Sequence, residues 1–205
     1  MDDLIAHIGE TVIHVTAASN LPLIEKHGLL PAATLARRAN VRPDDILLRK
    51  DRRVLQTDFG TAMLNHQKPI VHGSPKAGQN LDGISLRDWI RQLDERVFFW
   101  PEKRGADFAA SIAADTPIVF LTLSTRRLLA AFPDHIDLAP INSGNFRQGG
   151  AYALRGPWVY VPAKAGLRSF QTSRRERGLV KSLDPVREIS LRCAIDAVTL
   201  RSLRV

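Results

Sequence analysis

Residues 12–32, VIHVTAASNLPLIEKHGLLPA, decide the fold that the sequence predicts. The short apolar run at the start has the composition of a buried strand, and it carries His14. Asn20 is expected to cap the helix that follows, and Pro22 suits its first turn, where a missing N–H costs nothing. Gly28 is expected to end that helix. The stretch therefore predicts a tight strand–loop–helix unit with a histidine on the strand.

Hydrophobic periodicity predicts the other elements. Helices are expected at residues 31–40, 54–67, 85–95, 106–115 and 125–132, strands at 12–15, 96–101, 116–124, 158–162 and 185–195, and a loop at 73–83. Strands and helices follow one another without a regular βαβ rhythm, so the expected fold class is α+β. The chain has 205 residues with no internal repeat and no evident linker, and we expect a single domain over residues 1–205.

The overall charge suggests a partner and a compartment. A formal net charge of +8 favours contact with polyanions, nucleic acid first among them. The single cysteine, Cys193, cannot form an internal disulfide, and the acidic start MDDLIAHIGE lacks the features of a signal peptide, so a cytoplasmic protein is expected. No apolar stretch is long enough to span a membrane.

Most familiar enzyme motifs are missing from the sequence. It contains no G-x-G-x-x-G after a strand, no P-loop, no H-E-x-x-H and no paired C-x-x-C. His66 and His72 are six residues apart and have no obvious third ligand, so no metal site is expected. Three of the expected strands carry residues that are unusual for a plain core strand. The first carries His14, the second the aromatic run from Phe98 to Trp100, and the third the carboxylate of Glu188 among apolar neighbours.

In this order, the motifs resemble those of ADP-ribosyltransferase-fold proteins, especially the DarT-type DNA ADP-ribosyltransferases and their uncharacterised relatives. The first motif is matched by His14, Thr16, Asn20, Leu21, Ile24, Gly28, Leu29 and Leu30. RVFFWP at 96–101 is similar to the aromatic second motif, and VREISL at 186–191 is similar to the strand that presents the glutamate. The three motifs follow one another along the whole chain in the same order as in the family, but only a few residues match.

The resemblance implies an ADP-ribosyltransferase-like split β-sandwich with surrounding helices and with NAD⁺ in the cleft between two sheets. NAD⁺ would be contacted by His14, Thr16, Phe98, Phe99 and Arg53, the last chosen over Arg49 and Arg52. The aromatic side chains would stack on the nicotinamide, and the arginine would pair with the pyrophosphate. Glu188 would be the catalytic carboxylate, which stabilises the positive charge on the ribose as nicotinamide leaves.

The acceptor is expected to bind before the glutamate strand. Arg147, Tyr152 and Arg155 lie among glycines and would grip a phosphate backbone and stack on a base, and Arg174 and Arg175 would add backbone contacts. The predicted function is an NAD-dependent mono-ADP-ribosyltransferase acting on DNA or another nucleic acid. The resemblance also suggests a role as a toxin or in phage defence.

Three departures from the family pattern keep alternatives open. Phe98 and Phe99 stand where many relatives have a tyrosine, the arginine expected soon after the proline is displaced to Arg104, and Val186 replaces the first glutamate of an E-x-E pair. The last departure disfavours modification of protein arginines. One alternative is an NAD glycohydrolase with water as the acceptor. The other is a catalytically degenerate, basic module that binds nucleic acid or a partner protein.

Overall fold

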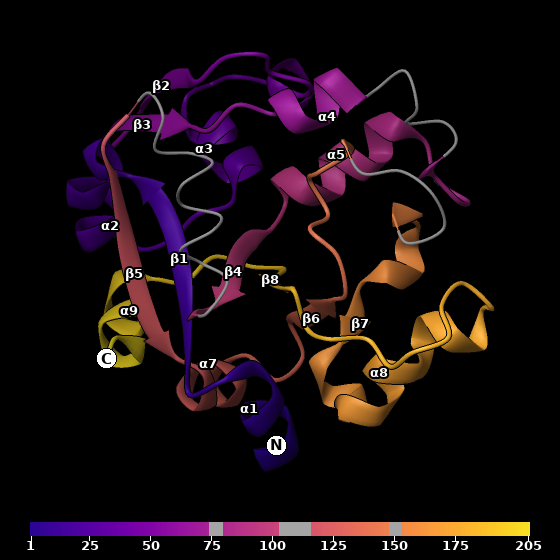
Figure 1. Cartoon of the computed structure of the whole chain (residues 1–205). Coiled ribbons are helices and arrows are strands. Elements are labelled where there is room, and N and C mark those ends of the chain that lie inside the picture. Colours follow the sequence, from indigo (N-terminus) through magenta and orange to yellow (C-terminus); the bar gives the residue numbers. More distant parts are fainter. Residues whose placement is uncertain (74–79, 103–115, 148–152) are drawn as a thin grey trace.

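The computed structural model describes residues 1–73, 80–102, 116–147 and 153–205 and has an α+β architecture, as expected (Figure 1). Its centre is a six-stranded antiparallel sheet with the strand order β5-β1-β4-β8-β6-β7. These strands are β1 (Thr11–Ala17), β4 (Val97–Pro101), β5 (Ile118–Ser124), β6 (Ile136–Ala139), β7 (Val161–Pro162) and β8 (Glu188–Leu191). A separate hairpin pairs β2 (Arg53–Thr57) with β3 (Gly60–Leu64).

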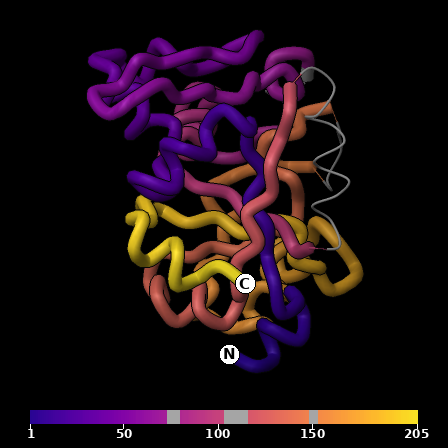
Figure 2. Tube along the Cα trace, turned by 90° about the vertical axis from the view of Figure 1, so that its left-hand side faces the viewer, coloured from indigo at the N-terminus to yellow at the C-terminus, as the bar shows by residue number. Residues whose placement is uncertain are grey.

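Short helices surround the sheet. They are α1 (Asp2–Ile8), α2 (Leu21–His27), α3 (Ala32–Arg38), α4 (Lys68–Gly73), α5 (Leu86–Asp94), α7 (Thr125–Ala131), α8 (Gly166–Glu176) and α9 (Ala197–Leu203), with 3-10 turns at Ala18–Asn20, Pro43–Ile46, Pro157–Val159 and Ala163–Ala165. Helix α3, the β2–β3 hairpin and α4 gather at one end of β1 and β5, and the second view shows the same part above the sheet (Figures 1 and 2). We call residues 32–73 the upper lobe. Among the described helices, none is long and apolar enough to cross a membrane.

The sheet opens between β1 and β4, its second and third strands. β1 pairs with β5 along its whole length, from Thr11–Ser124 to Ala17–Ile118. Its pairing with β4 is limited to Val12–Pro101 and Ile13–Trp100. The other half of β4 pairs with β8 instead. Beyond Ile13, β1 and β4 therefore diverge, and the sheet consists of two parts joined at one end.

The main core lies on one face of the sheet. Neighbouring residues in antiparallel strands share a face, so alternate positions form one apolar surface. The buried residues of this surface include Val12, Val97, Phe99, Leu121, Leu123, Ile189 and Leu191. Helices α1, α7 and α9 contribute Leu4, Ile5, Ile8, Leu128, Leu129, Leu200 and Leu203 to the same cluster. This core holds together the end at which β1 and β4 pair, and the end at which they diverge lies outside it.

Several predicted elements are confirmed. Ser85 caps α5 by accepting a hydrogen bond from the backbone N–H of Asp88, and Ser124 caps α7 in the same way. Strand β5 and the end of α2 at Gly28, where φ is 87°, also agree with expectation. The helix expected at 106–115 lies outside the described residues.

Other predicted elements are wrong. The prediction of a helix at 54–67 is wrong, because these residues form most of the β2–β3 hairpin, and Gly60, with φ 138°, is the first residue after its two-residue turn. Residues 158–162 contain a 3-10 turn and the two-residue β7. Asn20 makes no capping hydrogen bond: its side-chain amide bonds to both backbone groups of Met63 and to the Thr16 hydroxyl, and so ties the upper lobe to the end of β1.

Gly28 sits where no other residue fits, and this gives a test of the fold. A Cβ atom at Gly28 would lie 1.9 Å from the carbonyl oxygen of Ile195, and the positive φ adds strain. We expect Gly28→Ala to lower the free energy of unfolding by at least about 3 kcal/mol in urea titrations. Gly178→Ala is the matched control because its φ is 70° with nothing within 4 Å, and it should cost about 1–2 kcal/mol. Equal losses in the two variants would contradict this packing.

Candidate functional site

A cavity of about 460 Å³ lies where β1 and β4 diverge. Its walls come from residues 14–17 of β1, the β3–α4 segment at 63–70, the α5–β4 segment at 93–98, the loop at 142–147, and Glu188 of β8. The volume falls within the range of sites that enclose small molecules. The upper lobe thus forms one wall of the cavity, and the opened sheet forms another.

His14 spans the opening between the strands. Its Nδ1 lies 2.9 Å from the carbonyl oxygen of Phe98. Because a carbonyl oxygen only accepts hydrogen bonds, Nδ1 carries the proton and Nε2 is the acceptor nitrogen. Burial lowers the pKa of His14, and the hydrogen bond to Phe98 opposes this shift only in part. His14 is therefore a neutral imidazole, which keeps an acceptor on the cavity wall.

Glu188 is a buried carboxylate on the same cavity. Its side chain is 2% exposed. The Ser143 hydroxyl donates a hydrogen bond to Oε1 at 2.5 Å, and the Ser143 backbone N–H lies 3.4 Å from Oε2. Burial raises the pKa of Glu188 to about 7, although Ser143 and the positive charges of Arg155 and Arg96 act in the opposite direction. Glu188 therefore exchanges a proton near neutral pH.

Arg155 is not the exposed acceptor contact that the sequence predicted. It is 1% exposed, and its guanidinium donates to the backbone carbonyls of Asn142, Ser143, Asn145 and Ala153. It also lies 4.2 Å from the centre of the Phe146 ring. An arginine has five N–H donors in a rigid plane, so one side chain can hold a whole loop. Arg155 therefore shapes the loop at 142–147 from within.

Arg174 and Arg175, which were expected to contact the acceptor backbone, both lie on α8. Arg174 is 6% exposed and forms an ion pair with Asp184, so the predicted contact between this side chain and the backbone of a nucleic acid is wrong. Arg175 is exposed, but it does not line the cavity. Arg147 is exposed and lines the cavity, as an acceptor contact would require. Tyr152 lies outside the described residues.

Two expected NAD⁺ contacts point elsewhere. Phe99 is fully buried in the main core, because alternation along β4 turns it away from Phe98. Arg53 donates to the carbonyl oxygen of Asp45 and does not line the cavity, whereas Arg52 does. The structure thus brings together His14, Thr16, Phe98, Arg147 and Glu188 of the predicted site. Sequence reasoning missed Ser143 altogether, since an isolated serine in a loop carries no signal.

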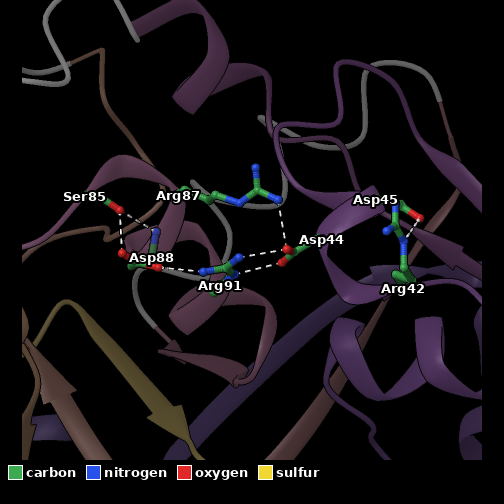
Figure 3. Close-up of polar contacts among 7 residues, drawn as sticks. All are labelled: Arg42, Asp44, Asp45, Ser85, Arg87, Asp88 and Arg91. Atoms are coloured by element: carbon green, nitrogen blue, oxygen red, sulfur yellow. Dashed lines mark hydrogen bonds and ion pairs between the residues drawn. The ribbon is translucent and has the colours of Figure 1, made fainter.

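Ion pairs attach the upper lobe to α5 and so hold the cavity wall (Figure 3). Asp44 accepts hydrogen bonds from Arg87 and Arg91, and Arg91 also donates to Asp88. These arginines hold the pKa of Asp44 well below its usual range. A second, buried pair joins Arg49 to Asp94 at 2.9 Å. The exposed ion pairs contribute little energy each, but the buried pair is costly to break, so it fixes the lobe more firmly.

The fold and the cavity define an α+β protein whose divided sheet presents a buried carboxylate to a small-molecule-sized space. The chain belongs to a family described as a family of unknown function (DUF7002), whose match covers residues 10–200. No curated protein and no solved structure matches the chain. Within the described part of the chain, no group of three or more histidine, cysteine, aspartate or glutamate residues is arranged to hold a metal ion.

The raised pKa of Glu188 gives a stability test. The folded state binds a proton that the unfolded state has released between the ordinary pKa of 4.5 and about 7, so the stability contributed by Glu188 falls as pH rises through this window. We expect Glu188→Gln to gain about 3 kcal/mol relative to the native chain between pH 4.5 and pH 8. Denaturant titrations across this range measure the difference, and a constant offset between the two proteins would refute the buried, protonatable carboxylate.

Proposed function

We propose that the chain is an NAD⁺-dependent ADP-ribosyltransferase of the histidine–aromatic–glutamate type, on an ADP-ribosyltransferase-like split sandwich. One observation carries this proposal: His14, Phe98 and Glu188, far apart in sequence, line a single cavity at the opening of the sheet. The limited pairing of β1 with β4 supports the split-sheet architecture that the motifs suggest. NAD⁺ acts here as a substrate, and no metal is invoked.

The side chains around the cavity suit the parts of NAD⁺. Phe98 and Trp100 offer aromatic surface to a flat ring, and Nε2 of His14 can accept a hydrogen bond from a ribose hydroxyl. Arg49 and Arg96 also line the cavity but are engaged in buried ion pairs, and the other cationic side chains of the walls, Arg52, Lys68 and Arg147, suit the negative charge of a diphosphate. In this arrangement Arg52 takes the part first expected of Arg53.

Glu188 would act at the ribose carbon that carries nicotinamide. The bond between that carbon and the ring nitrogen breaks, and its electron pair leaves with nicotinamide. The ionised carboxylate stabilises the positive charge left on the ribose and then takes the proton from the attacking acceptor. Because its pKa is near 7, the ionised fraction of Glu188 rises through neutral pH, and the rate should rise with it.

The acceptor is proposed to be DNA or another nucleic acid. The net charge of +8 favours a polyanion, and Arg147 extends from the cavity wall to the surface. Water is the other acceptor, which would make the chain an NAD glycohydrolase. A third possibility is a degenerate binding module, and the near-complete burial of Glu188 is the observation that favours it.

Binding and turnover separate these functions. We expect His14→Ala to weaken NAD⁺ binding by calorimetry at least tenfold, because it removes both the acceptor nitrogen and the bond across the opening. Glu188→Gln should retain binding and lose nicotinamide release by about 10²–10³-fold. His135→Ala, an exposed histidine away from the cavity, is the matched control and should behave as the native chain.

The identity of the acceptor determines whether nucleic acid stimulates nicotinamide release and where the ADP-ribose is found. Stimulation of nicotinamide release by single-stranded DNA or RNA, with ADP-ribose recovered on the nucleic acid, supports the transferase. Unstimulated release with free ADP-ribose supports the glycohydrolase. Binding of NAD⁺ without release supports the degenerate module, and no binding at all overturns the proposal.

A further inference from the structure

We infer that Ser143 is a positioning residue that orients the Glu188 carboxylate and favours its ionised form at the cavity, an inference that rests on the proposed function of Glu188. The hydroxyl of Ser143 donates to Oε1 at 2.5 Å. Its backbone N–H approaches Oε2 at 3.4 Å, so one residue offers a donor to each carboxylate oxygen. Both side chains are at least 98% buried, and the cavity lies beside them.

Ser143 is itself held firmly through its backbone. Its carbonyl oxygen accepts hydrogen bonds from Nε1 of Trp89 and from Nε of Arg155, both at 3.2 Å. Trp89 is fully buried in α5 and stacks on Tyr160 at 5.4 Å between ring centres. Arg155 also holds the carbonyls of Asn142 and Asn145, on either side. The position of the hydroxyl is therefore set before any ligand binds, which is the arrangement that precise orientation requires.

The other charged and titratable groups near Glu188 act without direct hydrogen bonds to it in the described residues. The positive charges are those of Arg155 and Arg96. Arg96 forms an ion pair with Asp137 on β6 at 2.6 Å and lies over the Tyr160 ring at 4.0 Å, so its donors are largely engaged. Burial raises the pKa of Tyr160 and the nearby Glu188 raises it further, so the phenol is neutral beside the carboxylate. Ser143 thus supplies the hydrogen bonds that distinguish the ionised form of Glu188 from the protonated one.

The test measures the titration of Glu188 directly, independently of turnover. The chain has six glutamates, and labelling their side-chain carboxyl carbons with ¹³C allows each to be followed by NMR. The resonance that disappears in Glu188→Gln assigns Glu188. We expect Ser143→Ala to raise the midpoint of its titration by about one pH unit, which is a tenfold lower ratio of ionised to protonated form at a given pH. Ser143→Thr keeps the hydroxyl and should restore the midpoint.

A matched control removes a similar hydrogen bond elsewhere. The Ser85 hydroxyl donates to the Asp88 carboxylate at 2.6 Å on the surface of α5 (Figure 3). Ser85→Ala should leave the Glu188 midpoint unchanged. If Ser143→Ala fails to fold, as judged by near-UV circular dichroism, Ser143→Cys replaces it, and the weaker thiol donor should raise the midpoint by a smaller amount.

Nicotinamide release adds the second measurement. The low-pH limb of the rate profile in Ser143→Ala should move by the same interval as the NMR midpoint, with KM for NAD⁺ unchanged. An unmoved Glu188 midpoint in Ser143→Ala overturns this inference whatever the rates are. A moved midpoint in a protein that releases no nicotinamide, native chain included, supports the hydrogen-bond assignment and overturns the proposed function.

Discussion

The hydrogen bond from the His14 ring to the Phe98 carbonyl oxygen is the interaction on which the site depends. Two neighbouring strands that separate leave backbone groups without partners, and such groups are costly to bury. The imidazole provides the Phe98 carbonyl with a donor at the point where β1 no longer can. It therefore stabilises the divergence of the strands, and the divergence makes the cavity. An apolar residue at position 14 would leave this carbonyl without its donor.

The surroundings of the cavity combine burial with charge. The Glu188 carboxylate and the Arg155 guanidinium lie in an interior that disfavours both ionised forms, and burial lowers the pKa of Arg155 to about 10. Two buried ion pairs, Arg49 with Asp94 and Arg96 with Asp137, contribute side chains to the cavity wall. Replacing such pairs by apolar residues often costs no stability. Their presence around one cavity is therefore better explained by the need to hold polar groups in fixed positions there.

The sequence predicted the parts of the fold that short-range chemistry determines. The strand at His14, the turn at Gly28 and the capped start at Ser85 each depend on neighbours in the chain. The β2–β3 hairpin is hidden in the sequence because its apolar residues, Val54, Leu55, Ala62, Met63 and Leu64, also fit a helical pattern that Gly60 merely interrupts. The sequence does not predict helix α8, because Arg174 occupies a buried position where an amphipathic helix normally has an apolar residue.

The candidate site was predictable to a similar degree. His14, Phe98 and Glu188 stand out as polar or aromatic residues on strands. Alternation along β4 turns Phe99 away from Phe98 and into the main core, where its ring lies 5.9 Å from that of His14. The role of Arg155 is not predictable from the sequence because its partners are backbone carbonyl oxygens that only the folded chain brings together. Ser143 gives no signal because its partner, the Glu188 carboxylate, lies far away in the sequence. A basic residue among glycines resembles a surface arginine, and nothing nearby in sequence indicates burial.

The divided sheet also has a consequence for how the protein folds. His14 and Phe98 are 84 residues apart, and Ser143 and Glu188 are 45 apart. Contacts of this separation require large loops to close before they contribute any stability, and they are absent from structure formed only locally. No contiguous fragment shorter than the span from His14 to Glu188 contains the complete cavity wall. A ligand that contacts both ends of this wall binds only the folded chain, so it stabilises the whole molecule against unfolding by an amount that grows with its concentration relative to Kd.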